Sequence, residues 1–177
     1  MASSPTNEDL HNDIYRAPIG DDGCYMTPTR IRMHRTLNAF MIWGIIMIII
    51  AVACTIAAYF QGQSYQDMEL VATGGNMING HSAGTLLRVA ALVYIVSGIL
   101  FIFLQHKGFT WFYERQSQFA ARGIALAICV IAAIWEAYII TVGIFDILAI
   151  ANIVIALTFF ASATKVETEE KRYNLSV

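Results

Sequence analysis

A weakly polar run of 45 residues extends from Phe119 to Ala163. As one straight helix the run would be roughly 68 Å long, more than twice the hydrocarbon thickness of a bilayer, about 30 Å. It must therefore fold back on itself. Gly143 suits the position just past a helix end, so we predict a turn at 141–143 and membrane spans near 119–140 and 146–163.

Two further apolar segments, at about 38–60 and 85–105, are each as long as one membrane crossing. The chain is 57% hydrophobic and 14% charged, whereas soluble domains carry roughly a quarter charged residues. We therefore expect an all-α integral membrane protein with four transmembrane helices, arranged as two helical hairpins. In this interpretation a polar tail over 1–36 precedes the transmembrane domain of 37–164, and a second polar tail covers 165–177.

The positions of lysine and arginine orient these spans. In a four-span arrangement, one side of the membrane receives Arg16, Arg30, Arg32, Arg35, Lys107, Arg115, Arg122, Lys165, Lys171 and Arg172. Arg88, a few residues inside the second span, is the exception. Because cytoplasmic loops carry an excess of Lys and Arg, we predict that both termini lie on the cytoplasmic side or its topological equivalent.

Polar residues inside the spans are candidates for an interhelical polar layer: Arg88, Glu136, Asp146 and Asn152. We expect the two acids and Arg88 just beneath the outer boundary, with the Asp146 carboxylate capping the fourth helix. Asn152 falls in mid-span, where an amide normally hydrogen-bonds a neighbouring helix. For Arg88, Glu136 and Asp146, two interpretations stay open. They could form a proton, cation or ligand site, or an ion pair and a helix cap that only stabilise the bundle.

At the inner boundary the sequence predicts membrane contacts. Arg30, Arg32 and Arg35 are placed to meet acidic lipid headgroups. The aromatic residues of the inner turn predict either an interfacial belt or a protein-docking patch: Phe109, Trp111, Phe112 and Tyr113. No histidine lies mid-span and the cysteines are scattered, so no metal or other cofactor is expected besides bound lipid.

No nucleophile–base set, phosphate-binding loop or paired catalytic carboxylates can be assembled, so we expect no enzymatic activity. No basic patch is dense enough for nucleic acid. The leading hypothesis is a noncatalytic structural or accessory subunit of a larger membrane assembly, with lipids and other membrane subunits as partners. One alternative is a tetraspan organiser of vesicles or membrane domains, which resembles MARVEL-type proteins in topology alone. The other is a small channel or transporter that uses Glu136, Asp146 and Arg88.

Overall fold

The computed structural model describes residues 17–21, 23–68, 77–78, 81–114 and 116–173. Its long helices are α2 (Pro28–Met68), α3 (Ala83–Trp111), α4 (Ser117–Thr141) and α5 (Ile147–Tyr173). Strands β1 (Met77–Ile78) and β2 (His81–Ser82) form a short antiparallel pair before α3. All four helices contain a segment long and apolar enough to cross a membrane, so the expected architecture of four long apolar helices is confirmed.

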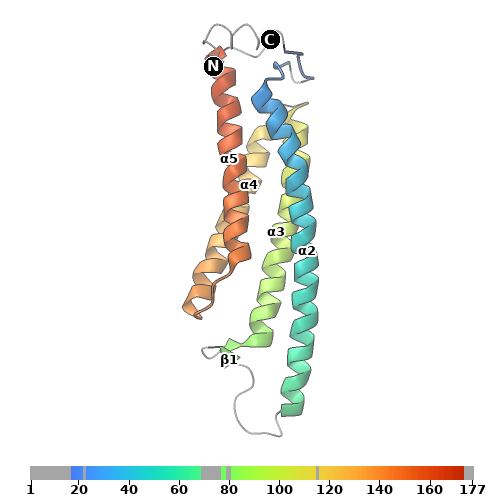
Figure 1. Ribbon diagram of the computed structural model, residues 1–177, viewed down its shortest axis with the longest axis vertical. Coiled ribbons are helices and arrows are strands. Elements are labelled where there is room, and N and C mark those ends of the chain that lie inside the picture. The colour runs from blue at the N-terminus through green and yellow to red at the C-terminus, as the bar shows by residue number, and fades with distance from the viewer. Residues whose placement is uncertain (1–16, 22, 69–76, 79–80, 115, 174–177) are drawn as a thin grey trace, which may run out of the picture.

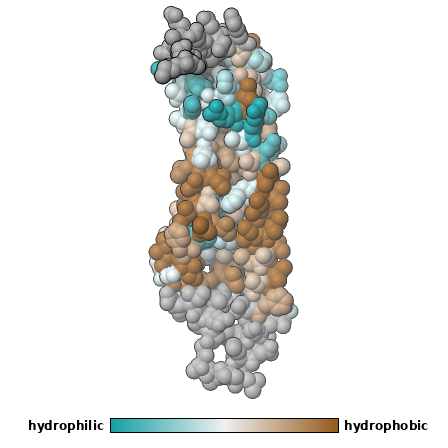
Figure 2. Space-filling view, viewed as in Figure 1, coloured by the Kyte–Doolittle hydropathy of each residue, from teal (hydrophilic) through white to brown (hydrophobic). Residues whose placement is uncertain are grey.

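The helices form an elongated up-and-down bundle (Figure 1), in which α2 packs along α3, α3 along α4, and α4 along α5. The start of α2 lies beside the C-terminal part of α5, where the Thr29 hydroxyl donates to Glu169 at 2.7 Å. The α3–α4 turn lies at the same end, since the Arg30 guanidinium is 5.2 Å from the centre of the Phe112 ring. We call this end the basic end. Figure 2 shows hydrophilic side chains gathered toward it and an apolar band below.

Helix α2 is longer than the predicted span at both ends. It begins at Pro28 because Thr27 caps it: the backbone N–H of Arg30 donates to the Thr27 hydroxyl at 3.2 Å. Proline suits the first helical position, where its missing N–H leaves no bond unmade. The helix then continues to Met68. Residues 28–36, which the sequence analysis assigned to the N-terminal tail, are therefore helical, and residues 1–16 of that tail lie outside the described residues.

Helix α5 also continues beyond its predicted end and includes 164–173. Val166 and Glu170 are buried at the basic end, which gives this amphipathic extension a packed face. Lys171 and Arg172 occupy the last turn, where cations interact favourably with the negative end of the helix dipole. The polar tail predicted over 165–177 is thus mostly an extension of the last helix as far as the described residues reach.

The turn between α4 and α5 is where the sequence predicted it. Helix α4 ends at Thr141, and Gly143 has a φ of 82°. The backbone N–H of Gly143 donates to Ile140, at 2.9 Å, and that of Ile144 donates to Ile139, at 3.1 Å. This paired pattern is a Schellman helix end, which requires the left-handed conformation that glycine adopts without strain.

Glycines set the spacing between α2 and α3. A Cβ atom added to Gly98 would lie 2.7 Å from the carbonyl oxygen of Gly44, and a Cβ on Gly44 would lie equally close to the carbonyl oxygen of Gly98. The backbones therefore approach more closely than any other residue would permit at these positions. Small residues at such crossings are typical of membrane helices. Nothing in the sequence itself indicates that these two glycines are neighbours.

Candidate functional site

The α4–α5 turn brings Glu136 and Asp146 into contact although they are ten residues apart. Asp146 directly precedes α5, and its backbone N–H donates to Oε2 of Glu136 at 3.3 Å. Glu136 lies on the inward face of α4 and is only 8% exposed. Helix reversal at Gly143 is what places the Glu136 side chain beside the backbone of Asp146.

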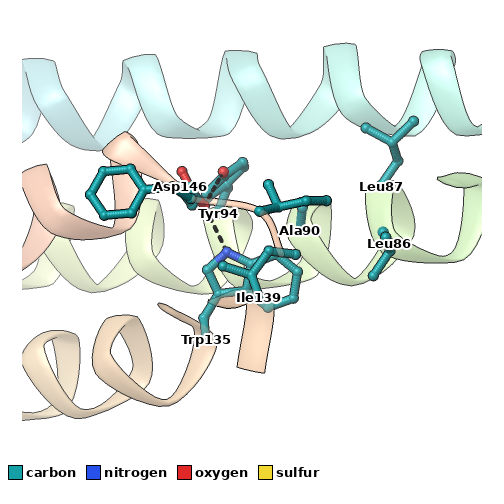
Figure 3. Close-up of a pocket in the computed structure, with 9 residues that line it drawn as sticks. Leu86, Leu87, Ala90, Tyr94, Trp135, Ile139 and Asp146 are labelled. Carbon is teal, nitrogen blue, oxygen red and sulfur yellow. Dashed lines mark hydrogen bonds between the residues drawn. The ribbon is translucent and has the colours of Figure 1, made fainter. Parts of the chain in front are cut away.

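Four donors converge on the Asp146 carboxylate. Its Oδ1 accepts the backbone N–H groups of Leu148, at 2.9 Å, and Ala149, at 3.4 Å, so the predicted cap of the last helix is confirmed. Its Oδ2 accepts the Tyr94 hydroxyl at 2.5 Å and the Trp135 indole N–H at 2.6 Å, as Figure 3 shows for the indole bond. An ionised carboxylate presents about four lone-pair sites, and all are used here.

Glu136 differs from its neighbour. Its Oε2 receives the single long bond from Asp146, while its Oε1 is buried without a hydrogen-bond partner in the described part of the chain. A buried polar atom left unpaired costs free energy comparable to a lost hydrogen bond, with a larger cost for a charged group. The Glu136 carboxyl is therefore the unsatisfied group of this site.

The other two residues of the predicted polar layer lie elsewhere. Arg88 is exposed on α3 and forms no ion pair with Glu136 or Asp146 in the structure. It precedes Tyr94 by six residues, about 9 Å along the helix. Asn152 is fully buried, and its Oδ1 accepts the Trp43 indole N–H at 2.7 Å, which links α5 to α2.

Sequence reasoning missed Tyr94 and Trp135, the two donors that reach Asp146 across helices. Both lie inside predicted spans, and the polar atoms of buried Tyr and Trp usually find a hydrogen-bond partner. A search for acceptors within reach of these two atoms would have pointed to the same turn. The distance between α3 and α4 that makes the contact was not accessible from one sequence.

A pocket of about 340 Å³ opens beside these groups. Its walls come from α3, α4 and the α4–α5 turn: Leu86, Leu87, Ala90, Tyr94, Trp135, Ile139, Ile144, Phe145 and Asp146. Figure 3 shows Tyr94, Trp135 and Asp146 clustered together, with Leu86 and Leu87 farther along α3. The pocket is therefore mainly apolar and carries one carboxylate among its lining groups.

No protein-family model, curated protein or solved structure matches this chain. Within the described ranges, no group of three or more His, Cys, Asp or Glu side chains is arranged to hold a metal ion. The candidate site therefore has to be interpreted from its own geometry.

At the basic end, the structure corrects one predicted lipid contact. Arg30 is 2% exposed, its Nε lies 3.8 Å from Glu170, and its guanidinium faces Phe112. A side chain so enclosed cannot reach lipid headgroups. Arg32 and Arg35 are exposed, and their headgroup contact remains a prediction.

The aromatic residues of the inner turn are mostly inside the bundle. Trp111 and Phe112 are buried, and the His34 ring meets Phe109 and Phe112 edge-on, at centroid distances of 4.5 and 4.9 Å. Trp111 and Phe112 therefore belong to the core, and they form neither an interfacial belt nor a docking patch. Tyr113 is exposed, with 60% of its surface accessible.

Proposed function

We propose that this protein is a noncatalytic structural subunit of a larger membrane assembly, and that it binds a neighbouring transmembrane helix through α2. The observation that carries the proposal is an exposed stripe of β-branched residues along α2. It consists of Ile42, Ile45, Ile49, Val52 and Ile56, which are 44–62% exposed. We call these five residues the α2 stripe.

The spacing of the α2 stripe alternates between three and four residues, which matches the seam of a left-handed helix pair. Isoleucine and valine have one strongly preferred rotamer in a helix, so they lose little side-chain entropy when another helix packs against them. Helix association in lipid depends on such van der Waals packing, because apolar burial itself gains little there. Contact with lipid requires only that the side chains be apolar. Because every residue of the α2 stripe is also β-branched, we infer that the stripe faces a protein partner.

Native purification in mild detergent tests this role, with particle mass and stoichiometry as the readout. Wild-type protein should run as part of a defined assembly. The double variant Ile45→Ala/Ile49→Ala should lose its partner. Val154→Ala/Leu157→Ala is the matched control, because these two α5 residues are similarly exposed and their substitution removes a similar side-chain volume. Wild-type protein that purifies alone, or stripe and control variants that behave identically, would refute the proposal.

A second candidate function is proton or cation transport, which the unpartnered Oε1 of Glu136 favours. Buried ionisable groups in membrane spans commonly belong to ion or proton pathways. Its test is flux through liposomes containing the wild type or Glu136→Gln. Transport predicts that the substitution abolishes flux, and equal flux for both proteins would remove this candidate.

A further inference from the structure

The pocket between α3, α4 and the α4–α5 turn has properties that a purely structural role does not require. Its volume of about 340 Å³ falls in the range of small-molecule sites, roughly 300–1,000 Å³. Most of its lining is aliphatic or aromatic, which excludes a strongly hydrated inorganic cation because such ions need several oxygen ligands. An occupant must therefore be largely apolar.

The charge of the site selects the sign of that occupant. Asp146 lines the pocket, and Glu136, which is not among the lining residues, lies next to it and accepts the Asp146 backbone N–H at 3.3 Å. Among the described residues, no lysine, arginine or histidine forms an ion pair with either acid, and Arg88, the cation expected in the same layer, is exposed. Two acids without a cationic partner favour a positively charged ligand, because charge attraction is strong in a poorly solvated site.

Two further features are consistent with a cation at this position. The Tyr94 and Trp135 rings both line the pocket, and aromatic faces attract ammonium groups, with Trp the most effective. The positive end of the α5 dipole would oppose a cation. However, α4 ends and α5 begins in the same short turn, so the negative end of the α4 dipole offsets it.

We propose that this pocket binds a small hydrophobic ammonium compound, an amine carried on a compact apolar body, with Asp146 as the counterion and Tyr94 and Trp135 as aromatic contacts. The proposal goes beyond the structural role and does not depend on it. The ammonium group need not displace the donors to Asp146, since attraction to a charged carboxylate acts over several ångströms in a low-dielectric site.

The test uses the full chain in phosphatidylcholine nanodiscs and three probes of nearly equal shape: 3-phenylpropylamine, 3-phenylpropan-1-ol and 3-phenylpropanoate. Binding is measured by calorimetry and tryptophan fluorescence, with empty nanodiscs subtracted. We expect saturable binding of the amine, at least tenfold tighter than that of the alcohol or the acid. Equal binding of amine and alcohol, or no saturable binding of any probe, would overturn the proposal.

Variants separate the charge of the site from its shape. Asp146→Asn keeps a good helix cap and should weaken amine binding at least tenfold, while Glu114→Gln, an exposed acid at the basic end, should leave it unchanged. Ala90→Leu keeps the charge but fills the pocket wall, and it should also abolish binding. This second variant decides the matter if Asp146→Asn does not fold. Unchanged affinity in either folded pocket variant would contradict the assignment.

Discussion

Asp146 is the side chain on which the contacts of the α4–α5 turn converge. It caps α5 and also joins that helix to α3 through Tyr94 and to α4 through Trp135. One carboxylate thus fixes the relative position of three helices. The sequence predicted the cap, because an Asp just after a Gly turn and before an apolar run is a recognised helix start, but it could not reveal the two cross-helix donors.

Replacing Asp146 with alanine should destabilise the protein by about 1–3 kcal/mol, since the cap is lost and two buried donors are left without an acceptor. Asp146→Asn should cost clearly less, because the asparagine oxygen can keep the helix cap while its NH2 group donates to the Tyr94 hydroxyl oxygen. Chemical unfolding in detergent micelles measures both free energies. Equal losses for alanine and asparagine would argue against the cap and the hydrogen bonds as the stabilising contacts.

The bond between Trp43 and Asn152 predicts a measurable coupling between α2 and α5. A double-mutant cycle with Trp43→Phe and Asn152→Ala should give a coupling energy of about 0.6 kcal/mol, the average for such bonds in membranes. Pairing Trp43→Phe with Val154→Ala is the control and should be additive, because Val154 is an exposed α5 residue. A coupling of zero in the first cycle would count against the bond.

At the scale of whole helices, the close crossing of α2 and α3 is set by backbone contact. Gly98 faces the carbonyl oxygen of Gly44, so a side chain added at Gly98 would force one of the two helices to shift. Helix number and the α4–α5 turn could be predicted from hydropathy and Gly143, because apolar length and turn chemistry are local. The pairing of Gly44 with Gly98 could not, since small residues are common in every span and only the spatial register makes two of them neighbours.

Gly98→Ala should therefore destabilise the protein by about 1–3 kcal/mol through overpacking. Gly123→Ala is the matched control, because a Cβ atom there meets nothing within 4 Å. That variant should be neutral or slightly stabilising, given the higher helix propensity of alanine. Thermal unfolding in detergent distinguishes the two, and equal melting temperatures would show that the helices do not cross as closely as described.

The ends of α2 and α5 show why the helical segments predicted from the sequence were too short. Hydropathy marks only the part of a helix suited to lipid, and it ignored the polar turns at the basic end. There Thr27 and Thr29 hydrogen-bond Glu169, at 3.3 and 2.7 Å, so the first turns of α2 are fastened to the last turns of α5. The Thr27–Pro28 pair was a readable start signal, whereas the buried position of Arg30 depended on this tertiary contact.

For the whole molecule, the distribution of charged residues predicts how the fold is oriented in a membrane. The start of α2, the end of α3, the start of α4 and the end of α5 share one end of the bundle, and the described lysines and arginines other than Arg88 belong to these segments. The long apolar sides of the four helices separate this end from the α4–α5 turn. Such a distribution predicts one orientation in a bilayer, by the positive-inside rule.

We expect the chain to cross a bilayer four times, with the basic end on one side. Single cysteines at Glu114, Lys171 and Thr141, in a background without Cys24, Cys54 and Cys129, test it by labelling sealed vesicles with a membrane-impermeant maleimide. Positions 114 and 171 should react from the same side and position 141 from the opposite side. Labelling of 114 and 171 from opposite sides, or of all three from one side, would contradict it.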